Sequence, residues 1–212
     1  SAMHIVGRPD VPKEKIVVLG GILFKEGIQG NCHLQHLTVR QAQSTGVAGE
    51  SSFTMEDVLV EQCGHHGVYA YNTGVVGRCT NVEVRHCGYS GVGAFRGASI
   101  TMTGAKTTVH HNCTKGDSRY YGLHVWGPSP TIQLVSPLTK EEVSIDNGGG
   151  GNWGGQWGGD IHQIKTIAAA PTVANETTSN SSTHQVVQTL PAFMPRQING
   201  LSLWKEAIVN TG

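Results

Sequence analysis

Five residues whose side chains could carry acid–base chemistry fall within one short stretch of the chain: Asp117, Arg119, Tyr120, Tyr121 and His124. Tyrosine, histidine and arginine side chains can each act as a base or an acid in catalysis. Functional groups usually sit on loops that a rigid scaffold holds, and these five lie on or beside a long loop. The competing interpretation, which the sequence favours, is that they pack the loop and shield it from solvent.

Three tryptophans are candidates for ligand binding. Trp153 and Trp157 lie in the glycine-rich segment 147–160, and Trp126 precedes it. This segment lacks the lysine and the serine or threonine of a phosphate-binding loop. Indoles that glycine neighbours leave exposed can stack on sugar rings. In the alternative, which is slightly favoured, the segment is a structural plug onto which the tail packs its apolar residues Leu201, Leu203 and Trp204.

The histidines and cysteines predict no metal site and no cofactor. Five of the eleven histidines cluster in short motifs: His65, His66, His86, His110 and His111. Two stacked histidines would still lack a third ligand at matching spacing. The five cysteines show no Cys-x-x-Cys spacing, so neither a zinc module nor a complete disulfide framework is expected.

Composition excludes several classes of protein. Only 14% of residues are charged, against about 25% in an ordinary domain, which excludes a coiled coil and disfavours a helical bundle. Lys+Arg and Asp+Glu are 15 each, so no nucleic-acid-binding surface is expected. No run of 18 apolar residues predicts a membrane span. Three Asn-x-Ser/Thr sequons leave the cellular compartment undetermined.

An internal repeat organises the chain. Residues 58–70 recur as residues 82–94, with the pattern Val-x-Val, a Cys-Gly turn and Gly-Val-x-Ala, at a constant offset of 24. A degenerate copy covers 107–113 and 122–125, with one residue inserted before its cysteine. Fainter copies lie at 37–39 and 143–145. The two-residue alternation and the glycine-rich corners predict short strands that cannot bury their apolar faces alone.

Stacking solves this burial problem. Copies placed about 4.8 Å apart pair every strand with its neighbours and enclose one core. A constant offset implies in-register parallel strands, and about 24 residues accommodate three short strands and three corners. We therefore expect Val58, Val60, Val68, Val82, Val84 and Val92 to point inward.

The repeat resembles that of the right-handed parallel β-helix, the pectin-lyase-like superfamily, over roughly residues 15–165. The resemblance implies an all-β fold, a single right-handed parallel β-helix of about five to six coils with a C-terminal capping tail. In that superfamily the corner residue is often an asparagine that forms a ladder. Here Cys63, Cys87 and Cys113 are expected at that corner, stacked, reduced and without a disulfide among them.

Two polar columns follow from the same alignment. Glu61, Arg85 and His110 align in one column, which predicts a solvated ladder of charge pairs. Gln62, His86 and His111 align in the next column and are interpreted as polar corner residues.

The chain divides into three parts. Residues 1–14 combine an apparent cloning remnant, Ser1-Ala2-Met3, with an N-terminal lead-in segment. Residues 15–165 form the β-helix, opening with strands at 15–19 and 21–24. Residues 166–212 are a linker and a tail that caps or clasps the stack, because an open strand edge must be covered. The stretch 201–209 is expected as a lateral strand or cap, or else as a short amphipathic helix.

The superfamily holds lyases, hydrolases, epimerases and proteins without activity, so the resemblance says little about function. The favoured hypothesis is a non-catalytic protein that recognises a glycan or a protein partner, or serves as a structural module. Oligomers could form through the tail. The alternative is a polysaccharide lyase or epimerase acting on a uronic-acid polymer. No two of the five aspartates share a repeat column, and the Asp-Pro-His signature of alginate-type epimerases is missing. Threonine pairs near residues 101–108 faintly suggest an ice-binding surface, but threonine does not recur at the offset of 24.

Overall fold

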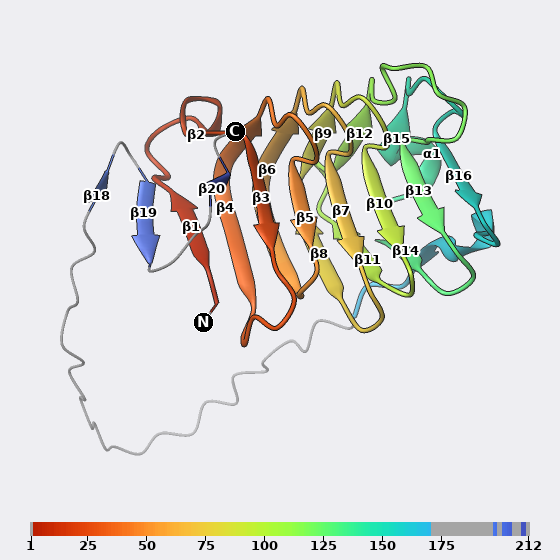
Figure 1. The fold of residues 1–212 in the computed structure, drawn as a ribbon, viewed down its shortest axis with the longest axis horizontal. Helices are drawn as coiled ribbons and strands as arrows, with labels where there is room; N and C mark the ends of the chain where they lie inside the picture. The colour runs from red at the N-terminus through yellow and green to blue at the C-terminus, as the bar shows by residue number, and fades with distance from the viewer. Residues whose placement is uncertain (1, 171–196, 199–200, 205–208, 211–212) are drawn as a thin grey trace, which may run out of the picture.

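Two parallel β-sheets form the body of the molecule (Figure 1). This computed structural model describes residues 2–170 together with 197–198, 201–204 and 209–210. The first sheet contains seven parallel strands, in stacking order β1 (His4–Gly7), β4 (Cys32–Arg40), β6 (Phe53–Glu61), β8 (Val76–Thr80), β11 (Ser99–Thr103), β14 (Thr131–Val135) and β17 (Ile164–Ile167). The second sheet contains β3 (Gly21–Phe24), β5 (Val47–Gly49), β7 (Val68–Tyr71), β10 (Val92–Phe95), β13 (Leu123–Trp126) and β16 (Trp153–Gln156). The prediction of an all-β protein with parallel strands is confirmed.

A third row of short strands branches from the first sheet. β2 (Val17–Leu19) pairs with the second half of β4, and β9 (Glu83–Arg85) pairs with the second half of β6. β12 (Thr108–His110) and β15 (Ser144–Ile145) continue this row. Helices in the described residues are short: η1 (Lys13–Lys15), α1 (Lys140–Val143) and η2 (Ile161–Gln163). None of them is long and apolar enough to cross a membrane.

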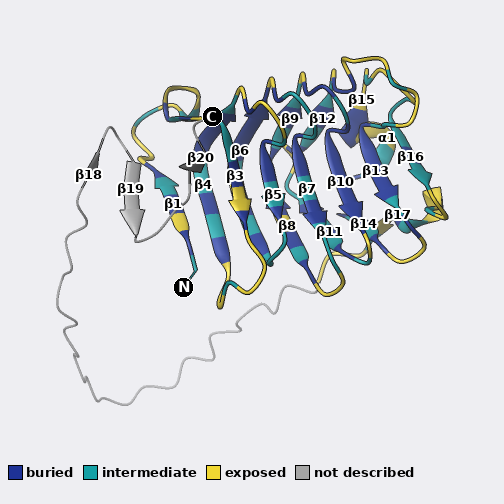
Figure 2. Cartoon of the chain, viewed as in Figure 1, coloured by how far each residue is buried: buried dark blue, intermediate teal, exposed yellow. Residues whose placement is uncertain are grey.

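The repeat offset sets the strand register. Val60 of β6 pairs with Val84 of β9, and Val68 of β7 pairs with Val92 of β10, as the offset of 24 predicts. The six valines expected to point inward all have exposed fractions of 0%: Val58, Val60, Val68, Val82, Val84 and Val92. They belong to one cluster of buried residues, and Figure 2 shows buried residues along the strands of both sheets. Each coil therefore buries its apolar face only by stacking on the next one.

The tail strands lie at the N-terminal end of the stack. β19 (Leu201–Trp204) pairs antiparallel with β1 and with β18 (Gln197–Ile198), and β20 (Val209–Asn210) pairs antiparallel with β3. The idea that residues 201–204 pack on the Trp153–Trp157 segment is therefore wrong, because that segment belongs to β16 and its flank at the opposite end. The physical reason is that β1 and β3 would otherwise present unpaired backbone groups.

The described residues can be compared with two of the expected domain limits. β1 lies within the lead-in segment 1–14 and already pairs with β4, so parallel stacking begins before residue 15. Of the expected linker and tail at 166–212, residues 171–196 lie outside the described residues.

Candidate functional site

A corner with a left-handed backbone follows each of β4, β6, β9, β12 and β15. Five residues, one in each of five successive coils, have φ values between 52° and 57°: Gln41, Gln62, His86, His111 and Asp146. This conformation turns the chain sharply, so that the following side chain points into the stack. Those inward side chains are Ala42, Cys63, Cys87, Asn112 and Asn147.

Asn112, and not Cys113, occupies the corner of the third repeat copy, so the prediction of a three-cysteine ladder is wrong at that position. Asn112 Nδ2 lies against Gly91 as Cys87 Sγ lies against Gly67 one coil earlier. The residue inserted before the cysteine shifts Cys113 one place beyond the corner, where its φ is 59°. The expectation of free thiols is confirmed, since all five cysteines are unpaired and buried.

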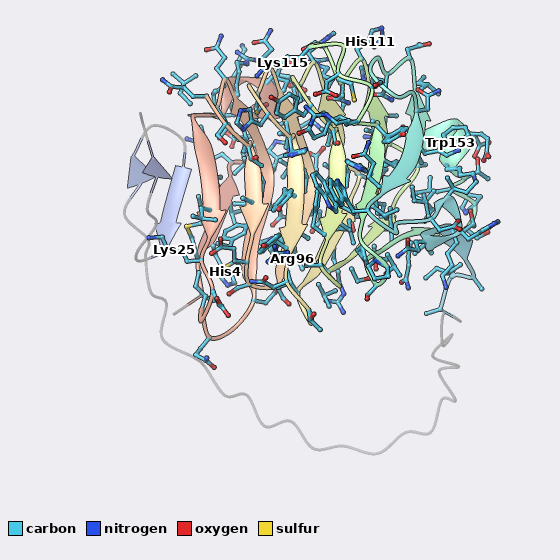
Figure 3. All side chains as sticks on the ribbon, turned by 45° about the vertical axis from the view of Figure 1, so that its right-hand side comes forward. His4, Lys25, Arg96, His111, Lys115 and Trp153 are labelled. Carbon is cyan, nitrogen blue, oxygen red and sulfur yellow. The ribbon has the colours of Figure 1, made fainter. Side chains whose placement is uncertain are left out.

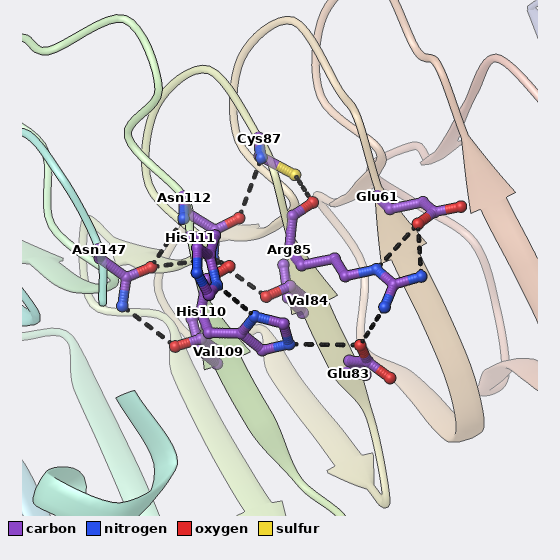
Figure 4. Close-up of polar contacts among 10 residues, drawn as sticks. All are labelled: Glu61, Glu83, Val84, Arg85, Cys87, Val109, His110, His111, Asn112 and Asn147. Atoms are coloured by element: carbon purple, nitrogen blue, oxygen red, sulfur yellow. Dashed lines mark hydrogen bonds and ion pairs between the residues drawn. The ribbon is translucent and has the colours of Figure 1, made fainter. Parts of the chain in front are cut away.

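The two asparagines form a hydrogen-bonded ladder (Figure 4). Asn112 Oδ1 accepts from the Cys87 backbone N–H at 3.1 Å, and Asn112 Nδ2 donates to the Val84 carbonyl at 3.0 Å. Asn147 repeats the pattern, because its Oδ1 accepts from the Asn112 N–H at 2.9 Å and its Nδ2 donates to the Val109 carbonyl at 3.0 Å. The ladder satisfies backbone groups that the sharp corners would leave unpaired.

The charged column also forms, but its centre is buried and not solvated as predicted. Glu61, with a side chain only 6% exposed, accepts from Arg40 Nε at 2.6 Å and from Arg85 Nε at 2.9 Å. Arg85 also contacts Glu83, which in turn contacts His110 Nε2 at 3.2 Å (Figure 4). Burial disfavours ionisation of Glu61, but the hydrogen bonds from Arg85 and Arg40 outweigh it and hold its pKa below the ordinary value.

The corner histidines are solvent-facing polar groups. His110 Nδ1 lies 2.8 Å from His111 Nδ1, and the rings of His86 and His111 are 5.4 Å apart. Partial burial and the neighbouring His111 lower the pKa of His86. Within residues 2–170 and the short described tail strands, no three His, Cys, Asp or Glu side chains are grouped as a metal site requires.

An aromatic face covers the outside of the second sheet. It consists of Tyr69, Tyr71, Phe95, Trp126 and Trp157, contributed by β7, β10, β13 and the turn after β16. Ring centroids are separated by 4.4 Å between Tyr69 and Phe95 and by 5.4 Å between Phe95 and Trp126. Trp126 and Trp157 are 6.3 Å apart with planes 5° from parallel. The rings therefore follow one another across successive coils.

Exposure varies along the aromatic face and is greatest at its C-terminal end. Phe95 is 5% exposed and folds over its own strand, whereas Trp157 is 76% exposed. Trp126 is half-buried beneath Trp157. Arg96, labelled in Figure 3, places its guanidinium 5.2 Å from the centre of the Tyr71 ring.

Trp153 lies apart from the aromatic face, at the end of the core (Figure 3). It pairs with Leu123 in the inward-pointing column of the second sheet and packs against the buried cluster. The Lys140 ammonium lies 5.5 Å from the centre of its ring. Of the three candidate tryptophans, the structure thus brings Trp126 and Trp157 together and gives Trp153 the position of a core cover.

A second, shorter aromatic stack lies at the adjoining corner. His65, Tyr89 and Tyr120 stack in sequence, with centroid distances of 4.9 Å and 4.2 Å. The Lys115 ammonium lies 4.6 Å from the Tyr89 ring centre. These residues occupy equivalent places in three repeat copies, so extending the repeat alignment across the corner identifies the stack.

The loop residues expected to carry acid–base chemistry are largely engaged with one another. Asp117 forms a two-pronged ion pair with Arg119, whose hydrogen bonds lower the pKa of Asp117 to about 2. Tyr120 is held in the stack on Tyr89, and burial raises its pKa. The Tyr121 ring covers Gly154.

His124 is the most buried of the candidate catalytic residues. It has an exposed fraction of 0%, its Nδ1 lies 3.0 Å from Ser90 Oγ, and its Nε2 has no hydrogen-bond partner within the part of the chain that the structure describes. Burial lowers its pKa to about 4. His66, two coils earlier, has an Nδ1 without a hydrogen-bond partner among the described residues, and burial together with His124 lowers its pKa to about 3. The lowered pKa values favour the neutral form of both imidazoles at pH 7. His124 is enclosed, whereas His66 is partly exposed.

An open groove continues the aromatic face toward the N-terminal coils. Its volume is about 420 Å³, and Leu23, Ala48 and Tyr69 form its floor and end walls. The corner residues Gln43, Ser44 and Thr45 line one side. The groove was not predicted from the sequence, because no motif marks it.

Comparison of the chain with protein-family models, with curated proteins and with solved structures found no match.

Proposed function

We propose that this protein is a non-catalytic module that binds an extended carbohydrate chain along the aromatic face of its second sheet. The observation that carries the proposal is the row of rings that ends in the stacked pair Trp126 and Trp157. An indole offers a flat apolar surface that fits the C–H face of a sugar ring. An exposed tryptophan such as Trp157 is typical of surfaces that meet a partner.

The geometry of the face favours a polymer over a single sugar. Its rings come from successive coils, so contacts are offered along the stack and not around one closed cavity. A linear chain can then make several weak stacking contacts at once, which together give useful affinity. A protein partner is the competing occupant, and the binding experiment below separates the two.

We infer that the protein folds as a right-handed parallel β-helix of about five to six coils, similar to the pectin-lyase-like superfamily. Two parallel sheets, the repeat offset of 24 and the Asn112–Asn147 ladder support this proposal. The tail strands beside β1 and β3 support a capping role for the tail.

The state of the acid–base candidates favours binding over catalysis. The Asp117 carboxylate is paired with Arg119, and His124 is enclosed beneath neighbouring rings. A general base must reach the proton that it abstracts, within hydrogen-bond distance or through one water. Neither residue is placed to do so on a polymer that lies along the aromatic face.

The test is binding of a soluble polysaccharide panel, containing neutral glucans, mannans and polygalacturonate, measured by calorimetry. We expect at least one polymer to bind, and Trp157→Ala to weaken that binding about tenfold. Trp157→Phe keeps a ring and should retain most of the affinity. Ile161→Ala removes an exposed apolar residue that is not part of the aromatic face and serves as the control.

Two outcomes contradict the proposal. Binding of no polymer in the panel removes the assigned function. Release of unsaturated uronides from polygalacturonate, detected by ultraviolet absorbance, establishes the lyase alternative.

A further inference from the structure

Large and small residues alternate in one outward column of the second sheet. Each coil contributes one residue to the column, and strand register gives their order as Leu23, Ala48, Tyr69, Gly93, His124 and Gly154. Neighbouring strands are about 4.8 Å apart, so Ala48 and Gly93 each leave a gap of about twice that spacing between two larger residues, and Gly154 leaves a gap beside His124 at the end of the column. Such a gap is wide enough to hold a ring edge-on or tilted.

The chain fills two of the three gaps with its own rings. A Cβ atom at Gly93 would lie 2.4 Å from Phe95 Cε2, because the Phe95 ring folds back over that glycine. A Cβ atom at Gly154 would lie 2.4 Å from Tyr121 Cε1, because the loop before β13 lays Tyr121 across it. In both cases a six-membered ring takes the place that the missing side chain leaves.

The third gap, at Ala48, is the open groove. Leu23, 39% exposed, and the Tyr69 ring form its two ends, and no ring of residues 2–170 is inserted between them. Its volume of about 420 Å³ lies within the range of small-ligand sites. Tyr69 is also the first ring of the aromatic face, so the groove and the face share a wall.

We propose that the Ala48 groove is a binding site for a neutral pyranose ring, which rests on the carbohydrate-binding function proposed above and adds a substrate class to it. A pyranose has an apolar C–H face and a rim of hydroxyl groups. The C–H face fits Tyr69 and Leu23, and the hydroxyls meet the polar corner residues Gln43, Ser44 and Thr45.

The lining of the groove determines the charge of the sugar. None of the ten residues that line it is charged. A uronate carboxylate placed there would lose hydration without gaining a cationic partner. A protein aromatic side chain would fit Tyr69 but leave the polar wall without hydrogen bonds. A neutral sugar ring satisfies both surfaces.

The experiment fills the groove with an aromatic ring at position 48, in the way that the Phe95 ring fills the gap at Gly93. Cellohexaose and laminarihexaose serve as neutral probes and hexagalacturonate as the charged probe, with dissociation constants from calorimetry. Ala48→Phe should weaken binding of the neutral probe about tenfold, and Ala48→Ser, which keeps the groove open, should change it by less than about twofold. Melting temperatures of both variants establish that they are folded.

A second measurement removes dependence on the stability of Ala48→Phe. In wild-type protein with ¹³C-labelled alanine methyl groups, the Ala48 resonance, assigned from its loss in Ala48→Ser, should shift on titration with the neutral probe. An unmoved Ala48 methyl resonance, equal affinity of Ala48→Phe and wild type, or preference for hexagalacturonate overturns the inference. If a polymer still binds and Trp157→Ala weakens it, the carbohydrate function stands and only the Ala48 site fails.

Discussion

Trp126 and Trp157 come from successive coils, and their indole planes lie 5° from parallel with centroids 6.3 Å apart. Trp153, only four positions before Trp157 in the chain, points the other way and covers the end of the core. The two tryptophans of one glycine-rich segment therefore have different roles, one packing inward and one facing solvent.

Alanine substitutions should separate these roles. Trp153→Ala leaves a cavity at the end of the core and should lower the free energy of unfolding by about 2 kcal/mol, less than for a fully buried tryptophan. Trp157→Ala should change it by less than about 0.5 kcal/mol, because the ring is 76% exposed. Urea unfolding followed by circular dichroism measures both. Equal losses of stability would contradict the assignment of Trp153 as the core cover.

Asn112→Ala should be strongly destabilising. The side chain is 1% exposed and makes hydrogen bonds to the backbone of Cys87, Val84 and His110, so its loss leaves buried polar groups unpaired. We expect a loss of about 3 kcal/mol in the free energy of unfolding. Cys113→Ala is the matched control and should cost about 1 kcal/mol. If Cys113→Ala proves the more damaging substitution, the corner position has been assigned to the wrong residue.

Glu61→Gln should lose about 2 kcal/mol at neutral pH, because Arg40 and Arg85 keep their charges while the partner between them becomes neutral. The expected loss is below that of a fully buried pair, since both guanidiniums are about one-third exposed. The pKa of Glu61 is lowered in the folded protein, so its contribution is present above the unfolded pKa near 4.5 and is lost as pH falls further. The difference between wild type and Glu61→Gln should therefore shrink below that pH in guanidinium or urea titrations.

The free energy of unfolding should also decrease as the pH is lowered from about 6.5 to about 4. This decrease has a separate cause. The pKa values of His66 and His124 are lowered by burial to about 3 and about 4, so the unfolded chain binds protons in this range while the folded protein does not. His124→Phe should flatten the slope of the free energy of unfolding against pH in this window. Glu61→Gln should leave that slope unchanged in the upper part of this window, since the contribution of Glu61 changes only as pH approaches its unfolded pKa near 4.5. A wild-type profile that is level from pH 6.5 to 4 would contradict neutral burial of the two imidazoles.

The repeat in the sequence determined the parallel strands, their register and the inward valines. Val60 and Val84 are 24 positions apart, and so are Val68 and Val92. A constant offset allows only one in-register stacking of the copies. The same alignment predicted that Glu61 and Arg85 would be neighbours. It did not predict burial of Glu61, because Arg40, from a much fainter copy, closes over it from the other side.

The tertiary structure alone decided the corner of the third copy and the functional surface. A single inserted residue can be placed before or after a corner, and only the hydrogen bonds of Asn112 show that Cys113 is displaced. The aromatic face depends on rings from several coils meeting at the spacing of the stack. Phe95 and Tyr121 fold back over Gly93 and Gly154, whereas no described ring covers Ala48, so the groove at Ala48 stays open. Such choices depend on contacts between residues distant in sequence, which local patterns of residue type do not encode.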